Sequence, residues 1–239
     1  MKIKLITLGC PKNLVDSEQI VGGLKTSGAT FVQNAEAADA VIINTCGFIQ
    51  SAKEESIETI LQAVEWKRRS RERRVFVTGC LSQRYGAELI QEIPEIDGIY
   101  GNRQLEKIVV EIASQLDLRR NLVGERELLT PKHYAYLKIA EGCEHPCTFC
   151  AIPAIRGNYR SKPIEQLVAE ARRLAAQEVK ELILIAQDTT LYGEDLYGQK
   201  RLPELLQALA HKPGIFLLGN IRLCLNQQVL SLAFNVLGH

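Results

Sequence analysis

Three short apolar runs in this chain each end at a cysteine, and the runs recur at nearly even intervals. They occupy residues 4–8, 40–44 and 74–78, and the cysteines that follow them are Cys10, Cys46 and Cys80. Intervals of 36 and 34 residues between the cysteines suit one strand–helix–strand crossover each, so the spacing predicts parallel strands of one sheet. Because parallel strands share a carboxyl edge, where open α/β sheets bind their ligands, we expect the three thiols to meet there.

Three cysteines at one sheet edge can be interpreted in two ways. A single cysteine at a strand end is ordinary, because cysteine is a small residue that is often buried. Three at the same edge fit that reading poorly, and thiolates are the usual ligands of iron–sulfur clusters. We therefore interpret Cys10, Cys46 and Cys80 as a three-cysteine iron–sulfur site, an interpretation that depends partly on a second cysteine motif further along the chain.

That second motif is a C-x3-C-x2-C run formed by Cys143, Cys147 and Cys150, which follows the apolar residues 134–139. Three thiolates on one short loop can hold three corners of a [4Fe-4S] cube and leave the fourth iron open for reaction. A structural zinc site is the alternative, with His145 as its fourth ligand. The chain has no separate C-x2-C pair of the kind that zinc sites usually combine, which favours the cluster.

The second motif, with Phe149 before its last cysteine, resembles the signature of the radical S-adenosylmethionine (SAM) enzymes. The resemblance implies that Cys143, Cys147 and Cys150 bind a [4Fe-4S] cluster whose open iron holds SAM, and that reduction of SAM there yields a 5'-deoxyadenosyl radical. It also implies that Phe149 packs near the adenine.

The two motifs together resemble the methylthiotransferase family, whose members join a three-cysteine domain to a radical SAM domain. Residues 8–18 and 184–193 are similar to the branch called the RimO type, which modifies an aspartate of a small-subunit ribosomal protein. The branch that modifies adenosine in transfer RNA typically has Gln-Met after its first cysteine and Gln-Asn-Val after the later strand. A transfer-RNA enzyme and a non-catalytic iron–sulfur carrier remain the alternatives.

The resemblance further implies two [4Fe-4S] clusters and two uses of SAM. One SAM gives its methyl group to a sulfur held at the Cys10/Cys46/Cys80 site, and a second gives the radical that activates the aspartate β-carbon. Gln187 is then expected to hold the SAM amino group, and Arg160 to contact SAM or substrate. Arg156 belongs to the same basic motif, although either arginine could instead be a surface charge. A ribosomal protein and a reducing electron donor are the expected partners.

Composition agrees with a globular cytoplasmic protein. Of 239 residues 46 % are apolar, and 29 basic against 28 acidic residues leave a net charge of +1, so bulk charge does not favour nucleic acid as a direct substrate. Seven cysteines without a secretory segment favour a reducing compartment. No apolar stretch approaches the ~18 residues that span a bilayer, so we expect no membrane association. The basic stretch 66–74 is interpreted as a solvated helix end, and Cys224 as a core residue.

The fold class expected is α/β: an N-terminal open parallel-sheet domain at residues 1–116, a linker at 117–133, and a partial radical SAM (β/α) barrel at 134–239. Asn13 is expected to cap the first helix. Helices are predicted at residues 14–27, 51–67, 105–116, 163–177 and 202–210, and strands of the second part at 134–139, 181–186 and 215–218.

The resemblance stops near residue 218. About 106 residues follow the linker, against the ~200 that a full barrel needs. We therefore expect an incomplete form of the enzyme with residues 215–223 as an open sheet edge.

Overall fold

The computed structural model describes residues 1–119, 126–210 and 216–217. By their internal contacts the residues form two compact units, one of Met1–Leu129 with Phe149–Arg156 and one of Thr130–Thr148 with the chain from Gly157 onward. The division at 1–116, 117–133 and 134–239 stays a prediction about domains. Residues 149–156, which begin with the last two residues of the second cysteine motif, Phe149 and Cys150, belong to the first unit.

The first unit contains a five-stranded sheet of order β2-β1-β3-β4-β5, and every neighbouring pair is parallel. The prediction of parallel strands from the cysteine spacing is confirmed. The strands are β1 (Lys2–Thr7), β2 (Thr30–Phe31), β3 (Ala40–Thr45), β4 (Arg74–Gly79) and β5 (Gly98–Gly101).

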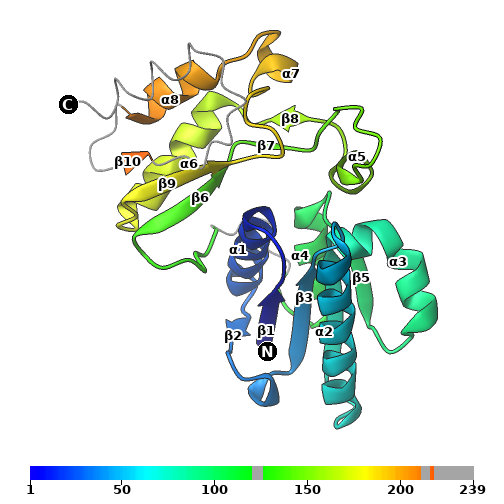
Figure 1. The fold of residues 1–239 in the computed structure, drawn as a ribbon. Coiled ribbons are helices and arrows are strands. Elements are labelled where there is room, and N and C mark those ends of the chain that lie inside the picture. Colours follow the sequence, from blue (N-terminus) through cyan, green and yellow to red (C-terminus); the bar gives the residue numbers. More distant parts are fainter. Residues whose placement is uncertain (120–125, 211–215, 218–239) are drawn as a thin grey trace. The chain divides into compact units, whose positions relative to one another are not determined.

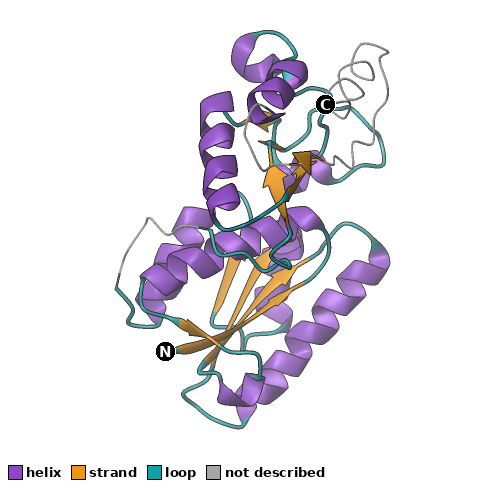
Figure 2. Ribbon diagram, turned by 90° about the vertical axis from the view of Figure 1, so that its left-hand side faces the viewer, coloured by secondary structure: helices purple, strands orange, loops and turns teal. Residues whose placement is uncertain are grey.

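Helices cover both faces of this sheet (Figures 1 and 2). Helices α1 and α4 pack on one face, where they share an apolar cluster with Ile42 and Phe76. Helices α2 and α3 pack on the other face around Val41, Ile43 and Val77. The helices of this unit are α1 (Pro11–Thr26), η1 (Ala35–Ala37), α2 (Gln50–Arg68), α3 (Cys80–Glu92), α4 (Leu105–Gln115) and the short α5 (Ile152–Arg156).

Strand β3 is the middle strand of the sheet. All six of its residues are buried, because successive side chains point to opposite faces and both faces carry helices. Its carboxyl end therefore opens between two helical layers, where a ligand site of an α/β sheet belongs.

The second unit contains a three-stranded parallel sheet of order β10-β9-β6 and a small antiparallel pair, β7 with β8. Two βα units of this kind agree with the expected partial radical SAM fold. Cys224 and most of the expected edge at 215–223 lie outside the described residues. The elements are β6 (Tyr134–Lys138), β7 (Ala140–Glu141), β8 (Arg160–Ser161), α6 (Ile164–Ala176), β9 (Glu181–Ile185), α7 (Glu194–Tyr197), α8 (Leu202–Ala210) and β10 (Phe216–Leu217).

The basic stretch at the end of α2 is engaged with acidic side chains. Arg69 and Arg73 both bind Glu36, at 2.8 and 2.9 Å, and Arg68 binds Glu95 at 2.6 Å. These pairs neutralise much of the local positive charge and support the interpretation of a helix end. Among the described helices, none has the length and apolar character needed to cross a membrane.

Candidate metal centres

The structure brings Cys10, Cys46 and Cys80 to the carboxyl edge of the first sheet. Cys10 is the N-cap of α1, Cys46 follows β3 directly, and Cys80 is the first residue of α3. The positive ends of two helix dipoles thus lie at the cysteines, and they favour the negative charge of thiolates. The meeting of the three cysteines at one edge agrees with the expectation from their spacing.

Glycines allow the cysteine-bearing loops to approach one another. A Cβ atom on Gly9 would lie 2.7 Å from Cβ and 3.0 Å from Sγ of Cys46. A Cβ on Gly47 would lie 2.9 Å from the carbonyl carbon of Cys80. The distances of 2.7 and 2.9 Å are too short for real Cβ atoms, so glycine is required at both positions for the three cysteine loops to approach this closely.

The proximity of the thiols affects the electrostatics of the site. Burial raises the pKa of the Cys80 thiol, and the adjacent thiols of Cys10 and Cys46 raise it further, while the Arg156 guanidinium opposes both effects. Cys80 is buried, whereas Cys10 and Cys46 are partly exposed. A ligand could therefore reach the site from the side of the first two cysteines.

Asn13 does not cap the first helix, and that expectation is wrong. Helix α1 begins at Pro11, so Asn13 lies inside its first turn, and Cys10 takes the cap position without a side-chain cap bond. The Asn13 amide instead donates to the carbonyl oxygens of Leu8 at 3.0 Å and Thr45 at 2.9 Å. Asn13 thereby ties together the chain segments that precede Cys10 and Cys46.

Asn13 is one of a group of polar residues that the first turns of α1 bury completely. Ser17 accepts from Thr7 at 2.7 Å and from Asn44 at 2.9 Å. Glu18 binds Arg126 at 2.6 Å and accepts from the backbone of Leu129. Buried polar groups in such a network fix the loop geometry. The sequence alone indicated no role for Asp16, Ser17 or Glu18. The buried polar residues of this group are Asn13, Asp16, Ser17 and Glu18, each at most 1 % exposed.

The segment 149–156 supplies the most deeply buried cation of this region. Arg156 is 2 % exposed, which excludes the surface-charge alternative for this residue. One guanidinium nitrogen donates to Asp16 at 2.7 Å, and another donates to Asn13 and to the Cys80 sulfur at 3.3 Å. Asn102 also donates to this sulfur, at 3.3 Å.

The cysteines of the second motif lie in a different environment. Cys143 and Cys150 are partly exposed and Cys147 is exposed. In the part of the chain that the structure describes, no three His, Cys, Asp or Glu side chains converge on a point where one metal ion could bind, and this holds for the Cys10, Cys46 and Cys80 group as well. Ligands of a cube bind different iron atoms, so their sulfurs need not converge in that way. Phe149 is 91 % exposed, and its packing on an adenine stays a prediction.

His145 has a protein partner of its own. Its Nε2 atom lies 2.7 Å from a carboxylate oxygen of Asp188, in the loop after β9. Burial raises the pKa of Asp188, but hydrogen bonds from Thr190 and His145 outweigh burial and leave this pKa below its usual value. An anchored His145 stabilises the loop and is less available as a zinc ligand.

Gln187 presents an unused acceptor. Its amide nitrogen donates to Glu141 at 2.9 Å, and the other carboxylate oxygen of Glu141 accepts from Lys138 at 2.7 Å. Among the described residues, Oε1 of Gln187 finds no hydrogen-bond partner although it is buried. Such an atom is expected to accept from a ligand. Arg160 is exposed in β8, and its contact with SAM or substrate stays a prediction.

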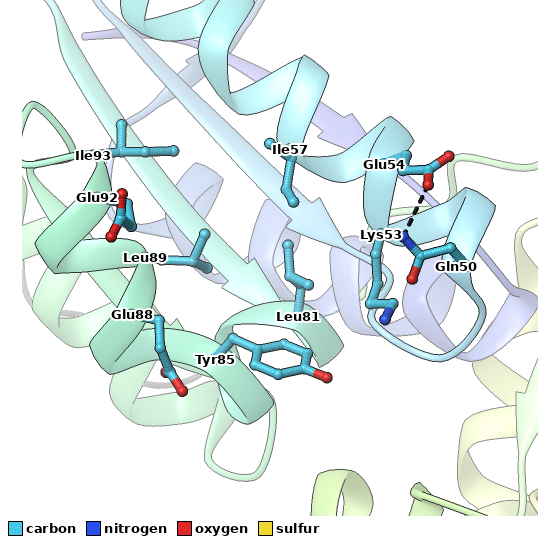
Figure 3. A pocket seen from close by; sticks show the side chains of 10 residues that line it. All are labelled: Gln50, Lys53, Glu54, Ile57, Leu81, Tyr85, Glu88, Leu89, Glu92 and Ile93. Carbon is cyan, nitrogen blue, oxygen red and sulfur yellow. Dashed lines mark hydrogen bonds between the residues drawn. The ribbon is translucent and has the colours of Figure 1, made fainter.

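A groove lies between α2 and α3, and side chains of both helices line it (Figure 3). Its floor is apolar and includes Ile57, Leu81 and Leu89. The acidic residues on its lining are Glu54, Glu88 and Glu92.

Two sequence profiles match the chain, one on each side of residue 130. The first, described as uncharacterized protein family UPF0004, covers residues 2–101 with all three strand-end cysteines. The second, the radical SAM superfamily, covers residues 137–227 with the C-x3-C-x2-C loop. The fold and the two cysteine groups thus define a radical SAM protein with an additional N-terminal cysteine domain, and this class supports an iron–sulfur cluster and SAM as cofactors.

Curated relatives identify the family within that class. Three proteins named ribosomal protein uS12 methylthiotransferase RimO are 50 %, 52 % and 53 % identical over 87–90 % of this chain, from Chloroherpeton thalassium, Christiangramia forsetii and Sulfurihydrogenibium sp.. The chain belongs to the RimO-type methylthiotransferase family. It spans about half the length of these relatives, 47–49 %.

Solved structures support the fold alone. The radical SAM methyltransferase TsrM from Kitasatospora setae, solved with tryptophan and a SAM analogue, superposes with a TM-score of 0.59 at 14 % identity and covers 87 % of this chain and 50 % of TsrM. The cobalamin-dependent SAM radical enzyme OxsB gives a TM-score of 0.54 at 10 % identity over 90 % of this chain and 38 % of OxsB. Both agree with an α/β domain followed by a partial radical SAM fold.

Proposed function

We propose that this chain is the cluster-binding part of a radical SAM methylthiotransferase that adds a methylthio group to an aspartate β-carbon of ribosomal protein uS12. The observation that carries the proposal is the presence of two separate groups of three cysteines, one on the edge of a parallel sheet and one on a loop. One cluster suffices to cleave SAM, so a second three-cysteine site has a different task. The names of the relatives supply the substrate.

The three-cysteine site of the first unit suits an iron–sulfur cluster in its donor set and its surroundings. Cys10 and Cys80 lie at the positive ends of helices, Cys46 follows β3, and Asn102 and Arg156 donate to the Cys80 sulfur. We assign to this site the sulfur that receives the methyl group.

The loop of Cys143, Cys147 and Cys150 would hold the SAM-cleaving cluster. When bound, that cluster supplies the electron that converts SAM into a 5'-deoxyadenosyl radical. Gln187 would bind the SAM amino group through its buried Oε1, and Lys138 and Glu141 orient the Gln187 amide for this purpose. The exposed ring of Phe149 would cover the adenine, and Arg160 would contact a carboxylate of SAM or substrate.

An aspartate β-carbon needs this kind of chemistry because its hydrogens are not acidic enough for a side-chain base. Radical abstraction removes one of them without a strong base. The remaining partners would be uS12 and a reducing electron donor, which places the reaction in the cytoplasm, where ribosomes and reduced thiols occur together.

The substrate is tested by anaerobic reconstitution with iron and sulfide, followed by incubation with SAM, a reductant, uS12 and transfer RNA. Mass spectrometry is expected to find the methylthio group on a uS12 aspartate and none on RNA. Methylthioadenosine in RNA with unmodified uS12 would identify the transfer-RNA enzyme. Bound clusters without SAM cleavage would identify an iron–sulfur carrier.

A further inference from the structure

Arg156 joins a buried carboxylate to one of the three thiols. The Arg156 and Asp16 side chains are each 2 % exposed and lie 2.7 Å apart. The same guanidinium donates to the Cys80 sulfur at 3.3 Å and to Oδ1 of Asn13. Asn13 in turn donates to the carbonyl oxygen of Thr45, directly before Cys46. The guanidinium is therefore part of a hydrogen-bond network that includes the loops of Cys46 and Cys80.

The backbone that carries Arg156 is fixed independently of this ion pair. Arg103, in the loop between β5 and α4, donates to the carbonyl oxygens of Ile155 at 3.3 Å and Pro153 at 3.4 Å, and also to Ala154. Arg103 is exposed, whereas Arg156 is buried. The chain therefore offers two arginines that hold the same segment, only one of which reaches a thiol.

A buried guanidinium beside a thiol changes the energy of negative charge there. Thiolates and an iron–sulfur cluster carry negative charge, which water solvates poorly at the buried Cys80. Positive charge and hydrogen bonds to the sulfurs stabilise the reduced form of a cluster more than the oxidised form, because the reduced form carries one more electron. Arginine suits this position because its planar fork can bind a carboxylate with one nitrogen and a sulfur with another.

We propose that Arg156 is a positioning residue of the three-cysteine site, where its guanidinium fixes the Cys80 sulfur and raises the reduction potential of the bound cluster, while Asp16 limits that effect. The inference rests on the proposed function, since it takes the Cys10, Cys46 and Cys80 thiols as cluster ligands. Arg156 follows the C-x3-C-x2-C motif in sequence, but its proposed role concerns the cysteines of the first unit.

The test measures the midpoint potential of the first-unit cluster by redox titration followed with electron paramagnetic resonance. The reconstituted chain carries Cys147→Ser in every sample, so that the cluster of the second motif does not contribute. Arg156→Gln is expected to make the potential more negative, and Asp16→Asn to make it less negative. The double variant is expected to fall between them, and Arg156→Lys to shift the potential less than Arg156→Gln does.

Arg103→Gln is the matched control, because it loosens the same segment without removing a charge from the sulfur. It is expected to leave the potential unchanged. If Arg156→Gln fails to fold, Asp16→Asn and the double variant still give the two opposed shifts. Equal potentials in all folded variants would overturn the role of Arg156 and leave the two-cluster proposal intact. Absence of a cluster in the Cys147→Ser parent would overturn both.

Discussion

The two cysteine groups are built in opposite ways. Cys10, Cys46 and Cys80 come from three loops at one sheet edge, and their positions are fixed by hydrogen bonds of Asn13 and by glycines packed against neighbouring loops. Cys143 and Cys147 lie on one loop, where Cys143 is partly exposed and Cys147 is exposed, and the hydrogen bond between His145 and Asp188 anchors that loop. The first site is thus assembled from several elements of a packed sheet, whereas the cysteines of the second motif lie close together in sequence and are more exposed.

The two sites also differ in the geometry that their proposed chemistry requires. A site that stores a sulfur benefits from fixed geometry, because the sulfur must be presented repeatedly in one orientation. A site that binds and releases SAM in each cycle needs an accessible loop.

Cys147→Ala should abolish SAM cleavage, reducing it to the level of protein without clusters. Cys46→Ala should leave cleavage unchanged, because the loop cluster alone supplies the electron. Deoxyadenosine formed under reduction, measured by chromatography, checks both variants. Equal loss in the two variants would contradict the division of roles.

Gly9→Ala should lower the free energy of unfolding by about 3 kcal/mol, since Gly9 has a φ of +89° and its Cβ would clash with Cys46. Gly28→Ala is the control, because its φ is +100° but no atom lies within 4 Å of the added carbon. It should cost about 1 kcal/mol, from backbone strain alone. Urea denaturation of the metal-free protein measures both losses, and only Gly9→Ala should also reduce iron binding. Identical effects would show that the close approach to Cys46 is unimportant.

Gln187→Ala should weaken SAM binding about tenfold, the loss expected for one hydrogen bond to a charged group. Iron content should not change, because Gln187 is not a cluster ligand. Gln62→Ala, on the exposed surface of α2, serves as the control. Calorimetric titration of the reconstituted variants with SAM measures the effect. An unchanged affinity would remove Gln187 from the SAM site.

In metal-free protein, Cys147 should be alkylated several-fold faster than Cys80. Cys147 is exposed and Cys80 is 7 % exposed, so modification of Cys80 requires local opening. Peptide mass spectrometry after a brief pulse of iodoacetamide gives both rates. Equal rates would mean that the first site is not preformed.

The sheet of the first unit was predictable because its apolar runs and cysteines recur at one crossover length. Helix α3 was not predicted, since Gly86 lies within it and the helix is kinked at Tyr85. Strand β5 was also missed, because four residues with a glycine at each end carry little strand signal.

The cysteines of both sites could be named from sequence, but the residues that orient them could not. Asn13 was expected to cap the first helix because asparagine is common at N-cap positions. In the structure its side-chain amide instead donates to the carbonyl oxygens of Leu8 and Thr45, contacts that the local sequence does not predict. Arg156 contacts Asp16 across 140 residues of sequence. No periodicity or local propensity predicts such a pair.

Each cysteine group is expected to hold its own [4Fe-4S] cluster. Iron and sulfide analysis with Mössbauer spectroscopy tests this expectation on four samples: the reconstituted chain, Cys147→Ala, Cys46→Ala and the double variant. We predict that both single variants give Mössbauer signals typical of [4Fe-4S] clusters. Each single variant should retain about half of the iron, and the double variant should retain almost none. Full loss of iron in either single variant, or zinc in place of iron at the loop, would contradict the account.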